Sequence, residues 1–461
     1  MRSENEILIE IKAKEEALNL YAFKILKVPV WRIIRFPIRA NKLKEETGFL
    51  NRSTFVKFSF IEVLLNYFKS LIEFLSIILR RKKYRYLVLA FPRLINYNNE
   101  YLDKFTDPLI AQSNLKNNTL VLQRNLSGNQ FKPRLNVGAD YKTSDFIDYT
   151  SKFVGFLLMP FIYIIYYKKI KVLIKNASSY FSLSKKYKFI LAFKISEFLT
   201  QYLFVKIIFK AIKVKQVFLV DRIIFLPFIA VAKTKNIEVL ELQHGITHSE
   251  TTLYTGPYQQ EIDPGIFLNF GSIWIGKQFS IPIEQQVNIG WAYNSWLLDK
   301  IQVKVKLRSV LVVSSPAITE QVLKTTLELA REYKDYVFSI RLHPQEVLST
   351  IQIEKINAVF NIKLDDNIID SLVSILKHEY VIGENSSVLY EALNLGKPVA
   401  KIMFNNLISK GELDDKIRNL TYLYKVDDFL SYVSNSRAEN INFSGIYDTF
   451  DIMKFNRLLK I

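Results

Sequence analysis

The pattern of apolar and polar positions divides the chain into short apolar runs and longer stretches with helical spacing. From Val310 onward, each apolar run is followed by a single helical stretch, and a less regular version of this alternation precedes Trp291. Apolar strands that alternate with single helices are typical of a parallel sheet covered on both faces. The sequence therefore predicts an α/β protein with two facing Rossmann-like domains. The expected strands are YLVLA (86–90), TLVLQ (119–123), VFLVD (217–221), IEVLELQ (237–243), IFLNF (266–270), QVNIG (286–290), VLVVSS (310–315), VFSIRLH (337–343), FNIKL (360–364), YVIG (380–383) and PVAKIMF (398–404).

The chain length and the spacing of these runs suggest where the domains divide. A chain of 461 residues suits two or three domains. The first eighty residues have helical spacing, so we expect helices before the first sheet. We place an N-terminal domain with this helical extension at 1–300 and a C-terminal domain at 301–445. The last segment, 446–461, is expected to form a helix that packs back across the division.

One apolar stretch needs separate treatment. Residues 153–167 (FVGFLLMPFIYIIYY) are followed by Lys168 and Lys169. A membrane-spanning helix needs about 20 apolar residues, so this stretch is short for a span. The first interpretation is a helix buried in a core. A helix that lies in the lipid interface and a true span are the alternatives.

Charge separates the two halves of the chain. Residues 1–250 hold 41 Lys and Arg against 20 Asp and Glu, whereas residues 251–461 hold 22 against 24. Twelve lysines and a single acid, Glu197, lie between Lys168 and Lys215. This distribution suggests that the first half meets an anionic partner: a membrane surface, a phospholipid-linked acceptor or nucleic acid. The absence of cysteine excludes disulfides and thiolate metal sites, and residues 1–20 do not resemble a secretory signal. We therefore expect a cytoplasmic protein.

Two polar clusters follow expected strands of the C-terminal half, where doubly wound sheets bind ligands. The first is Arg341-Leu342-His343-Pro344, in which the guanidinium suits phosphate and the imidazole offers a flat ring with polar nitrogens. The second is 383–387 (GENSS), in which Ser386 and Ser387 open a helix whose N-terminal N–H groups suit phosphate. Glu391, one turn further on, suits ribose hydroxyls. The alternatives are a strand-end histidine bound to backbone, a plain serine N-cap and a solvated glutamate.

A third cluster, Gln243-His244-Gly245, follows a strand of the N-terminal half. A neutral imidazole suits removal of a proton from an attacking hydroxyl, so His244 is the first candidate for a catalytic base. Donor or acceptor binding and a structural role are the alternatives. Glu261 and Asp263 are the nearest acids and supply another candidate base, although an acidic stretch before Pro-Gly is often only a turn.

The two C-terminal clusters together resemble a known group of enzymes. Arg-x-His-Pro, followed by Glu-x-Ser-Ser-x-x-x-Glu-Ala and then Gly-Lys-Pro at 396–398, is similar to the donor half of bacterial surface-polysaccharide transferases of GT-B fold. The closest patterns are those of bacterial sialyltransferases, capsule Kdo transferases and CDP-glycerol glycerophosphotransferases, which often carry Gln-His-Gly as well. The resemblance covers about residues 237–400. It implies that His343 and Pro344 contact the nucleotide, that Ser386 and Ser387 contact its phosphate with Arg341 nearby, and that the donor is linked to CMP or CDP.

These observations predict a metal-independent glycosyltransferase that needs no cofactor. It would move a sugar, or a unit such as glycerol phosphate, from a nucleotide donor to a lipid-linked or growing surface glycan of capsule, lipopolysaccharide or teichoic acid type. The sequence contains no Asp-x-Asp, Walker A, G-x-G-x-x-G or zinc-ligand pattern. The basic half would hold the protein at the inner membrane face. The alternatives are a nucleotide-sugar epimerase, a non-enzymatic protein that binds nucleic acid or membranes, and an inactive scaffold. Nucleic acid is not the expected partner, since the lysines interleave with apolar runs and no nucleic-acid motif appears.

Overall fold

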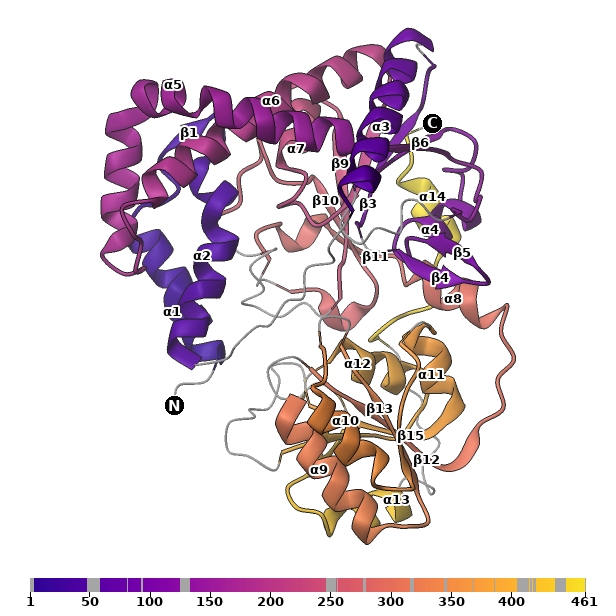
Figure 1. Cartoon of the computed structure of the whole chain (residues 1–461). Helices are drawn as coiled ribbons and strands as arrows, with labels where there is room; N and C mark the ends of the chain where they lie inside the picture. The colour runs from indigo at the N-terminus through magenta and orange to yellow at the C-terminus, as the bar shows by residue number, and fades with distance from the viewer. Residues whose placement is uncertain are drawn as a thin grey trace.

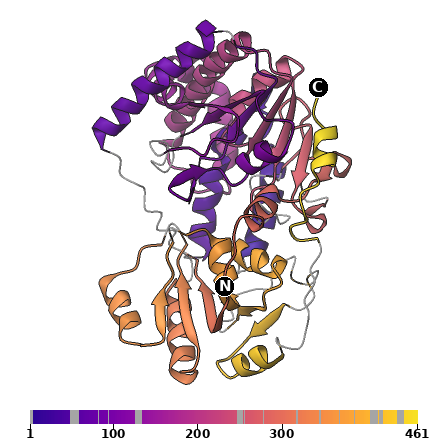
Figure 2. The same cartoon turned by 90° about the vertical axis from the view of Figure 1, so that its right-hand side faces the viewer.

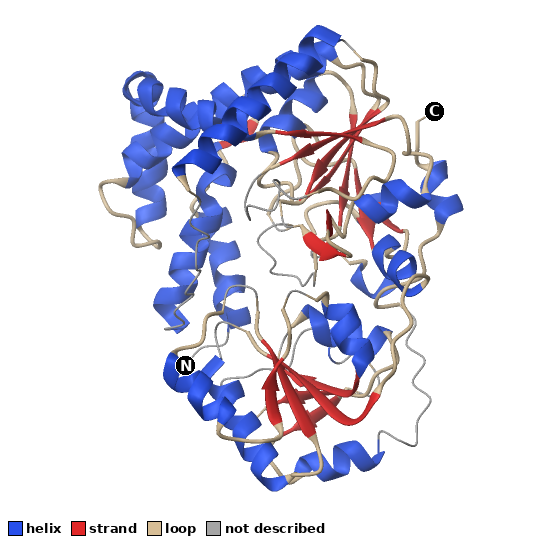
Figure 3. Ribbon diagram, turned by 45° about the vertical axis from the view of Figure 1, so that its right-hand side comes forward, coloured by secondary structure: helices blue, strands red, loops and turns tan. Residues whose placement is uncertain are grey.

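The computed structural model of the chain describes most of its length (Figure 1). The described residues are 4–47, 59–80, 82–92, 94–124, 133–245, 254, 256–276, 279–315, 319–343, 346–367, 369–384, 386–403, 414, 417, 420–435 and 445–460. They form two α/β domains, each built on one parallel sheet with helices on both faces (Figure 3). The predicted fold class is confirmed. The sheet of the N-terminal domain ends with Asn288, and that of the C-terminal domain begins with Lys306.

Seven parallel strands form the N-terminal sheet, in the order β11-β10-β9-β8-β3-β6-β7. The strands β3, β6 and β8 are buried at every position, which explains why the central residues of each strand are all apolar. The edge strand β7 is polar and only half-buried, and the apolar pattern did not predict it. The strands are β3 (Tyr86–Ala90), β6 (Thr119–Gln123), β7 (Asp140–Thr143), β8 (Gln216–Val220), β9 (Glu238–Leu242), β10 (Ile266–Asn269) and β11 (Gln286–Asn288).

Helices surround this sheet and extend it at the N-terminus. A two-stranded hairpin, β1 (Lys24–Ile25) and β2 (Val28–Pro29), joins the first two helices, and a second hairpin is formed by β4 (Ile95–Tyr97) and β5 (Glu100–Leu102). The two longest helices, α5 and α6, pack along one another. The helices are α1 (Glu4–Ala17), α2 (Val30–Thr47), α3 (Phe60–Arg80), α4 (Asp107–Gln112), α5 (Asp145–Ser178), α6 (Tyr187–Ala211), α7 (Leu226–Thr234), α8 (Ala292–Leu298) and the 3-10 turns η2 (Ser272–Trp274) and η3 (Ile283–Gln285).

Six parallel strands form the C-terminal sheet, in the order β14-β13-β12-β15-β16-β17. When the strands are numbered in chain order, the sheet order is 3-2-1-4-5-6, so the direction in which successive strands are added reverses between β12 and β15. The last strand, β17, was not predicted from the apolar pattern. The elements are β12 (Lys306–Val313), α9 (Thr319–Glu332), β13 (Val337–Arg341), α10 (Thr350–Asn357), β14 (Ile362–Leu364), α11 (Ser371–Lys377), β15 (His378–Gly383), α12 (Ser387–Asn394), β16 (Val399–Ile402), β17 (Thr421–Leu423) and α13 (Asp428–Asn435).

The end of the chain lies against the N-terminal domain (Figure 2). The helix α14 (Ile452–Arg457) places Phe455 against Phe218 of β8, with ring centroids 5.9 Å apart. The Gln216 amide donates to the Leu458 carbonyl at 2.8 Å. Gly290, with φ +74°, allows the returning backbone to approach, since a Cβ there would lie 2.2 Å from the Thr449 carbonyl oxygen.

The apolar stretch 153–167 is not buried in a core. It lies in α5, and its large side chains are exposed, including Phe153 (65%), Phe161 (63%) and Ile165 (69%). The first interpretation of this stretch is therefore wrong. The physical reason is that α5 turns its small side chains, Ser151 and Gly155, toward the protein.

Candidate functional site

The two predicted clusters of the C-terminal domain meet at one edge of the sheet. Val313 of β12 pairs with Arg341 of β13 on one side and with Gly383 of β15 on the other. Because these strands are parallel, the residues that follow them lie side by side at their carboxyl ends. The segments that begin at Ser314, His343 and Glu384 therefore lie at the same edge of the sheet, where the strand order reverses and where such sheets bind ligands.

Ser386 is the N-cap of α12. Its backbone is extended, and its hydroxyl oxygen accepts from the Val388 N–H at 3.3 Å. Ser387 is the first residue of the helix, and both serines are half-buried. The capping role that the sequence offered as an alternative is therefore present. It is compatible with a phosphate site, because a capping hydroxyl keeps its own proton to donate and the remaining N-terminal N–H groups point the same way.

Glu391 does not lie where the ribose prediction needs it. Its side chain is 3% exposed, because it lies on the buried face of α12. One oxygen accepts from the Ser371 hydroxyl at 2.9 Å, and the other lies 3.6 Å from the Lys104 ammonium of the N-terminal domain. Burial raises the pKa of Glu391, and Lys104 partly opposes that effect. Glu391 thus connects the two domains. Because its carboxylate is buried and paired there, the prediction that it binds ribose hydroxyls is corrected.

Arg341 is likewise engaged inside the protein. Its guanidinium forms an ion pair with Asp365 at 2.6 Å and also donates to the Ser374 hydroxyl at 2.9 Å. A further bond of 2.6 Å reaches the Ile369 carbonyl. Through these bonds Arg341 fixes the loop before α11, and its role as a phosphate neighbour stays a prediction.

A carboxylate that the sequence analysis missed organises the start of this edge. Glu346 accepts from the His343 backbone N–H, from the Ser314 hydroxyl at 2.6 Å and from the Thr319 hydroxyl. It therefore ties the ends of β12 and β13 to the start of α9. The half-buried His343 is positioned through this backbone bond. The only sequence signal was an acid three positions after His343, whereas Pro344 lies outside the described residues.

Beneath α12, a buried ion pair fixes the helix from the side of β16. The Lys401 ammonium lies 2.6 Å from one Asp414 oxygen, and the Tyr390 hydroxyl donates to the same oxygen at 3.0 Å. Burial lowers the pKa of Lys401, and Asp414 counteracts this by favouring the charged ammonium. The start of α12 is thus held on a rigid support.

Across the domain contact, His244 follows β9. Its ring is half-buried beside Phe91 and Phe105, with centroid distances of 4.3 Å and 5.3 Å. Its backbone N–H donates to the Tyr254 hydroxyl at 2.8 Å. Gln243 is buried, and its amide bridges the Gly245 carbonyl and the Phe270 N–H. Gln243 therefore shapes the loop that presents His244.

Asp263 does not present an accessible carboxylate. It is fully buried and forms ion pairs with Arg32 of α2 at 2.6 Å and with Arg222 at 3.2 Å. Arg222 also binds the buried Glu241. Burial alone would raise the pKa of Asp263, but the two guanidinium groups outweigh burial and lower it. The prediction that Asp263 is a candidate base is therefore corrected, because its carboxylate is a buried ion-pair partner. Glu261, two residues earlier, is exposed.

Asp221 is a further candidate that the sequence analysis missed. It follows β8 where the N-terminal sheet reverses its order between β3 and β8, and β8 pairs with β9, which precedes His244. Its φ of 73° is unusual for a side chain other than glycine. Burial and then the Glu241 carboxylate raise the pKa of Asp221 to about 7. A carboxylate at the end of a central strand, as in VFLVD, was the available signal.

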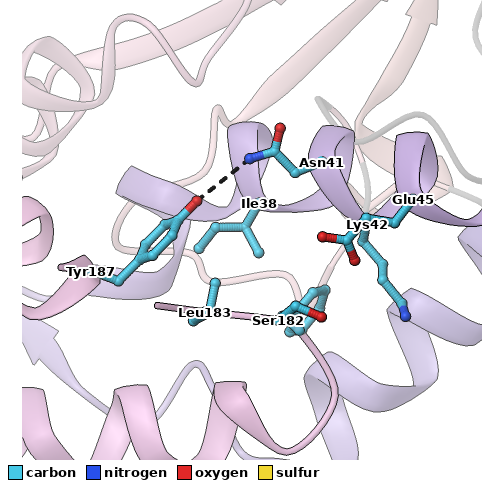
Figure 4. A pocket seen from close by; sticks show the side chains of 8 residues that line it. Ile38, Asn41, Lys42, Glu45, Ser182, Leu183 and Tyr187 are labelled. Carbon is cyan, nitrogen blue, oxygen red and sulfur yellow. Dashed lines mark hydrogen bonds between the residues drawn. The ribbon is translucent and has the colours of Figure 1, made fainter. Parts of the chain in front are cut away.

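A cavity in the N-terminal helical part of the protein is separate from the sheet edges described above. It occupies about 340 Å³ between α2 and the turn that joins α5 to α6 (Figure 4). The Asn41 amide donates to the Tyr187 hydroxyl there at 3.5 Å. None of the predicted site residues lines it. Within the described part of the chain, no three His, Asp or Glu side chains gather in a metal-binding arrangement.

Comparison with known proteins supports the fold. No family model matches the chain, and no curated protein matches it. Among solved structures, the UDP-GlcNAc 2-epimerase from Methanocaldococcus jannaschii matches with a TM-score of 0.51 and 11% identity, covering 82% of this chain and 99% of that one. The epimerase from Neisseria meningitidis bound to UDP-GlcNAc gives 0.47 and 12%, covering 80% and 97%. The wall teichoic acid polymerase TagF gives 0.42 and 12%, covering 84% and 93%. At 11% identity, the likeness to the first of these structures concerns the fold alone, which is an arrangement of two α/β domains with parallel sheets.

Proposed function

We propose that the protein is a glycosyltransferase that uses a nucleotide-activated sugar. The observation that carries this proposal is the pairing of β12 with both β13 and β15, which places the segments of His343 and Ser386 at the carboxyl ends of strands along one edge of the sheet. The helix α12, which Ser386 caps, touches the N-terminal domain through Glu391 and Lys104. A donor at this edge would therefore lie beside the domain that carries His244 and Asp221.

The donor half would act mainly through hydrogen bonds to the nucleotide. Ser386, Ser387 and the N–H groups at the start of α12 would receive the donor phosphate, which favours a helix N-terminus. The His343 ring would contact the base or ribose. Their resemblance to cytidine-dependent transferases leads us to propose a CMP- or CDP-linked donor.

The N-terminal half would receive the acceptor and take its proton. The acceptor oxygen forms a bond to the anomeric carbon as the bond to the nucleotide phosphate breaks, and the leaving electron pair stays on that phosphate. The acceptor proton goes to a base, and His244 or Asp221 would supply it. A general base works best with a pKa near the operating pH, and burial followed by the Glu241 carboxylate raises the pKa of Asp221 to about 7.

The acceptor would be a lipid-linked or growing surface glycan of capsule, lipopolysaccharide or teichoic acid type. We further propose that the protein works in the cytoplasm as a peripheral protein of the inner membrane face. The basic first half supports this placement, since lysines near an anionic surface contribute about 1 kcal/mol each.

Nucleotide binding gives the first test. In a thermal-shift screen, CMP or CDP should raise the melting temperature more than UDP or GDP, and a ligand at a hundred times its Kd adds about 2.7 kcal/mol. Ser386→Ala with Ser387→Ala should shrink that shift. Ser59→Ala is the matched control, because Ser59 caps α3 by accepting from the Glu62 N–H at 3.1 Å in the other domain. Equal shrinkage in both proteins would refute the phosphate role.

An acceptor-free reaction separates the transferase from an epimerase of the same fold. An epimerase would invert a sugar carbon of its nucleotide sugar without any acceptor, whereas the proposed transferase needs one. Proton NMR of UDP-GlcNAc and of cytidine-linked sugars incubated with the protein would follow both outcomes. Epimer formation without an acceptor would replace the transferase proposal.

A further inference from the structure

The helix α3 turns its more apolar face to the outside. Its four buried residues are the polar Asn66 and Ser70 together with Phe74 and Ile77. By contrast, eight large apolar side chains of the helix are exposed, up to 79% for Phe60. Helices at the surface of a protein in water normally show the opposite arrangement. The exposed large apolar side chains of α3 are Phe60, Ile61, Leu64, Leu65, Phe68, Ile72, Leu75 and Leu79.

The central part of α5 repeats this inversion, whereas the two ends of the helix bury apolar side chains such as Ile147 and Ile170. Ser151 and Gly155 face inward, and α6 approaches so closely that a Cβ on Gly155 would lie 2.9 Å from the Glu197 backbone nitrogen. Apolar side chains cover the outer side. Those exposed between the lysines at 152 and 168 are Phe153, Phe156, Leu157, Leu158, Phe161, Ile164, Ile165 and Tyr167.

The two helices are neighbours. The Tyr67 hydroxyl of α3 shares a hydrogen bond of 3.0 Å with Thr150 of α5, and the rings of Tyr67 and Phe146 are 5.5 Å apart. Figures 1 and 3 both show these helices and α6 at the end of the N-terminal domain that lies away from the C-terminal domain. The exposed apolar residues of α3 and α5 given above are called the apolar face below. A surface of this extent marks an interaction site.

Charge around the apolar face indicates what it meets. Exposed basic side chains surround it on α3, α5 and the adjoining α6, and on the segments that join α3 to β3 and α6 to β8. The acid Glu197 of α6 is buried and paired with Lys194. An amphipathic surface that combines apolar side chains with lysines suits an anionic bilayer. The apolar side chains enter the boundary between headgroups and acyl chains, and the lysines meet the anionic headgroups. The exposed basic residues are Lys69, Arg80, Lys82, Lys83, Lys152, Lys168, Lys169, Lys171, Lys175, Lys206, Lys210, Lys213 and Lys215.

The same features argue for a helix on the membrane rather than through it. By length and composition α5 is able to cross a bilayer, and its most apolar window is 11% buried. However, its apolar stretch between Lys152 and Lys168 is shorter than the roughly 20 residues that a span needs. A crossing α5 would also carry α6 into the bilayer, together with the Lys194–Glu197 pair.

We propose that the apolar face lies in the headgroup–acyl boundary of an anionic lipid bilayer, with α3 and α5 both inserted side-on. The inference extends the membrane attachment of the proposed function from its lysines to a defined apolar surface. It does not depend on the transfer chemistry, because no nucleotide or acceptor takes part in it.

Vesicle flotation tests the surface with a matched control. The full chain should float with vesicles of phosphatidylcholine and phosphatidylglycerol, and Leu65→Ser with Phe68→Ser and Ile72→Ser should weaken that binding at least about tenfold. The control variant combines Leu307→Ser, Val347→Ser and Phe360→Ser, which are similarly exposed in the C-terminal domain. It should bind as the unchanged protein does. Unchanged binding of the α3 variant, or an equal loss in the control, would overturn the proposal.

Insertion depth gives a second measurement. The four native tryptophans are buried, so Phe161→Trp supplies an exposed reporter on α5, and Phe360→Trp supplies one in the C-terminal domain. Lipids brominated near the headgroup should quench the first reporter and leave the second unchanged. Stronger quenching by bromine at the acyl-chain ends would indicate a span and overturn side-on insertion.

Two further outcomes separate this proposal from its rivals. Sedimentation of the α3 variant tests a second copy of the chain as the occupant: loss of a dimer with unchanged vesicle binding would assign the apolar face to an interface between copies. The nucleotide thermal shift of the α3 variant should equal that of the unchanged protein. A missing nucleotide response with normal vesicle binding would count against the proposed function and leave the membrane surface standing.

Discussion

Replacing Asp263 by asparagine distinguishes an ion-pair partner from a catalytic base. Four buried charges form one neutral network: Arg32 and Arg222 with Asp263 and Glu241, each at most 6% exposed. Asp263→Asn leaves two guanidinium groups beside a single carboxylate. Removing one partner of a buried ion pair costs about 3–5 kcal/mol, because the remaining charge stays desolvated. We expect a loss of that size in the free energy of unfolding.

The matched control is an exposed pair of the same chemistry. Asp335 lies 3.4 Å from Arg308, and both side chains are more than half exposed. Exposed pairs contribute about 0–1 kcal/mol, so Asp335→Asn should be nearly neutral. Urea denaturation followed by circular dichroism measures both changes. A second variant, Asp263→Asn with Arg32→Met, restores a neutral network and should recover part of the lost stability.

The pH dependence gives an independent check with a defined sign. The pKa of Asp263 is lowered in the folded protein, so its carboxylate adds stability above its usual value near 3.8, and that stability is lost as the pH falls through the folded pKa. The difference in stability between the unchanged protein and Asp263→Asn should therefore shrink below pH ~4. A loss below about 1 kcal/mol together with a turnover drop of about 10²–10⁴ would refute the ion-pair role and make Asp263 the base.

Three further substitutions test other parts of the structure. The turnover of Asp221→Asn should be compared with that of His244→Ala, because removal of the general base lowers turnover by about 10²–10⁴. If Asp221 is the base, the activity of the unchanged protein should fall as the pH drops through about 7. This pH dependence should be absent in Asp221→Asn. A nucleotide shift abolished by His244→Ala would instead make His244 a donor ligand. Gly155→Leu should separate α5 from α6 and lower the melting temperature, because its Cβ meets the Glu197 backbone; an unchanged melting temperature would contradict that close approach.

The apolar pattern predicted the sheets well because most strands are buried on both faces. The runs at 86–90 and 119–123 coincide with β3 and β6, whose side chains are buried at every position. The polar β7 lies at the edge of the sheet and is only half-buried, so its residues need not be apolar. The apolar pattern therefore contained no signal for this strand. The inversion of α3 also escaped detection, because helical spacing does not say which face turns inward.

The candidate site was predicted less well, because a residue type does not reveal its partner. Arg341 has the chemistry to bind phosphate, yet its guanidinium is held by Asp365, 24 positions away. Asp263 is engaged by Arg32, 231 positions away in the helical extension. Both partners are brought close only by the tertiary fold. The positions of Ser386 and His343 were predictable, because a residue that ends a strand or opens a helix keeps that place whatever packs around it.

The helix α12 links the proposed donor site to the contact between the domains. Its N-cap is Ser386 at the carboxyl edge of the sheet, and one turn further on the buried Glu391 meets Lys104 of the N-terminal domain. Tyr390, between them in sequence, packs against Trp274 of the same domain with ring centroids 5.9 Å apart, and its hydroxyl donates to Asp414. Because α12 has only eight residues, its first turn and the residues at the domain contact belong to one short, packed helix, and packed interiors transmit strain. A phosphate that moved the start of α12 would therefore also act on the contact with the domain that carries His244.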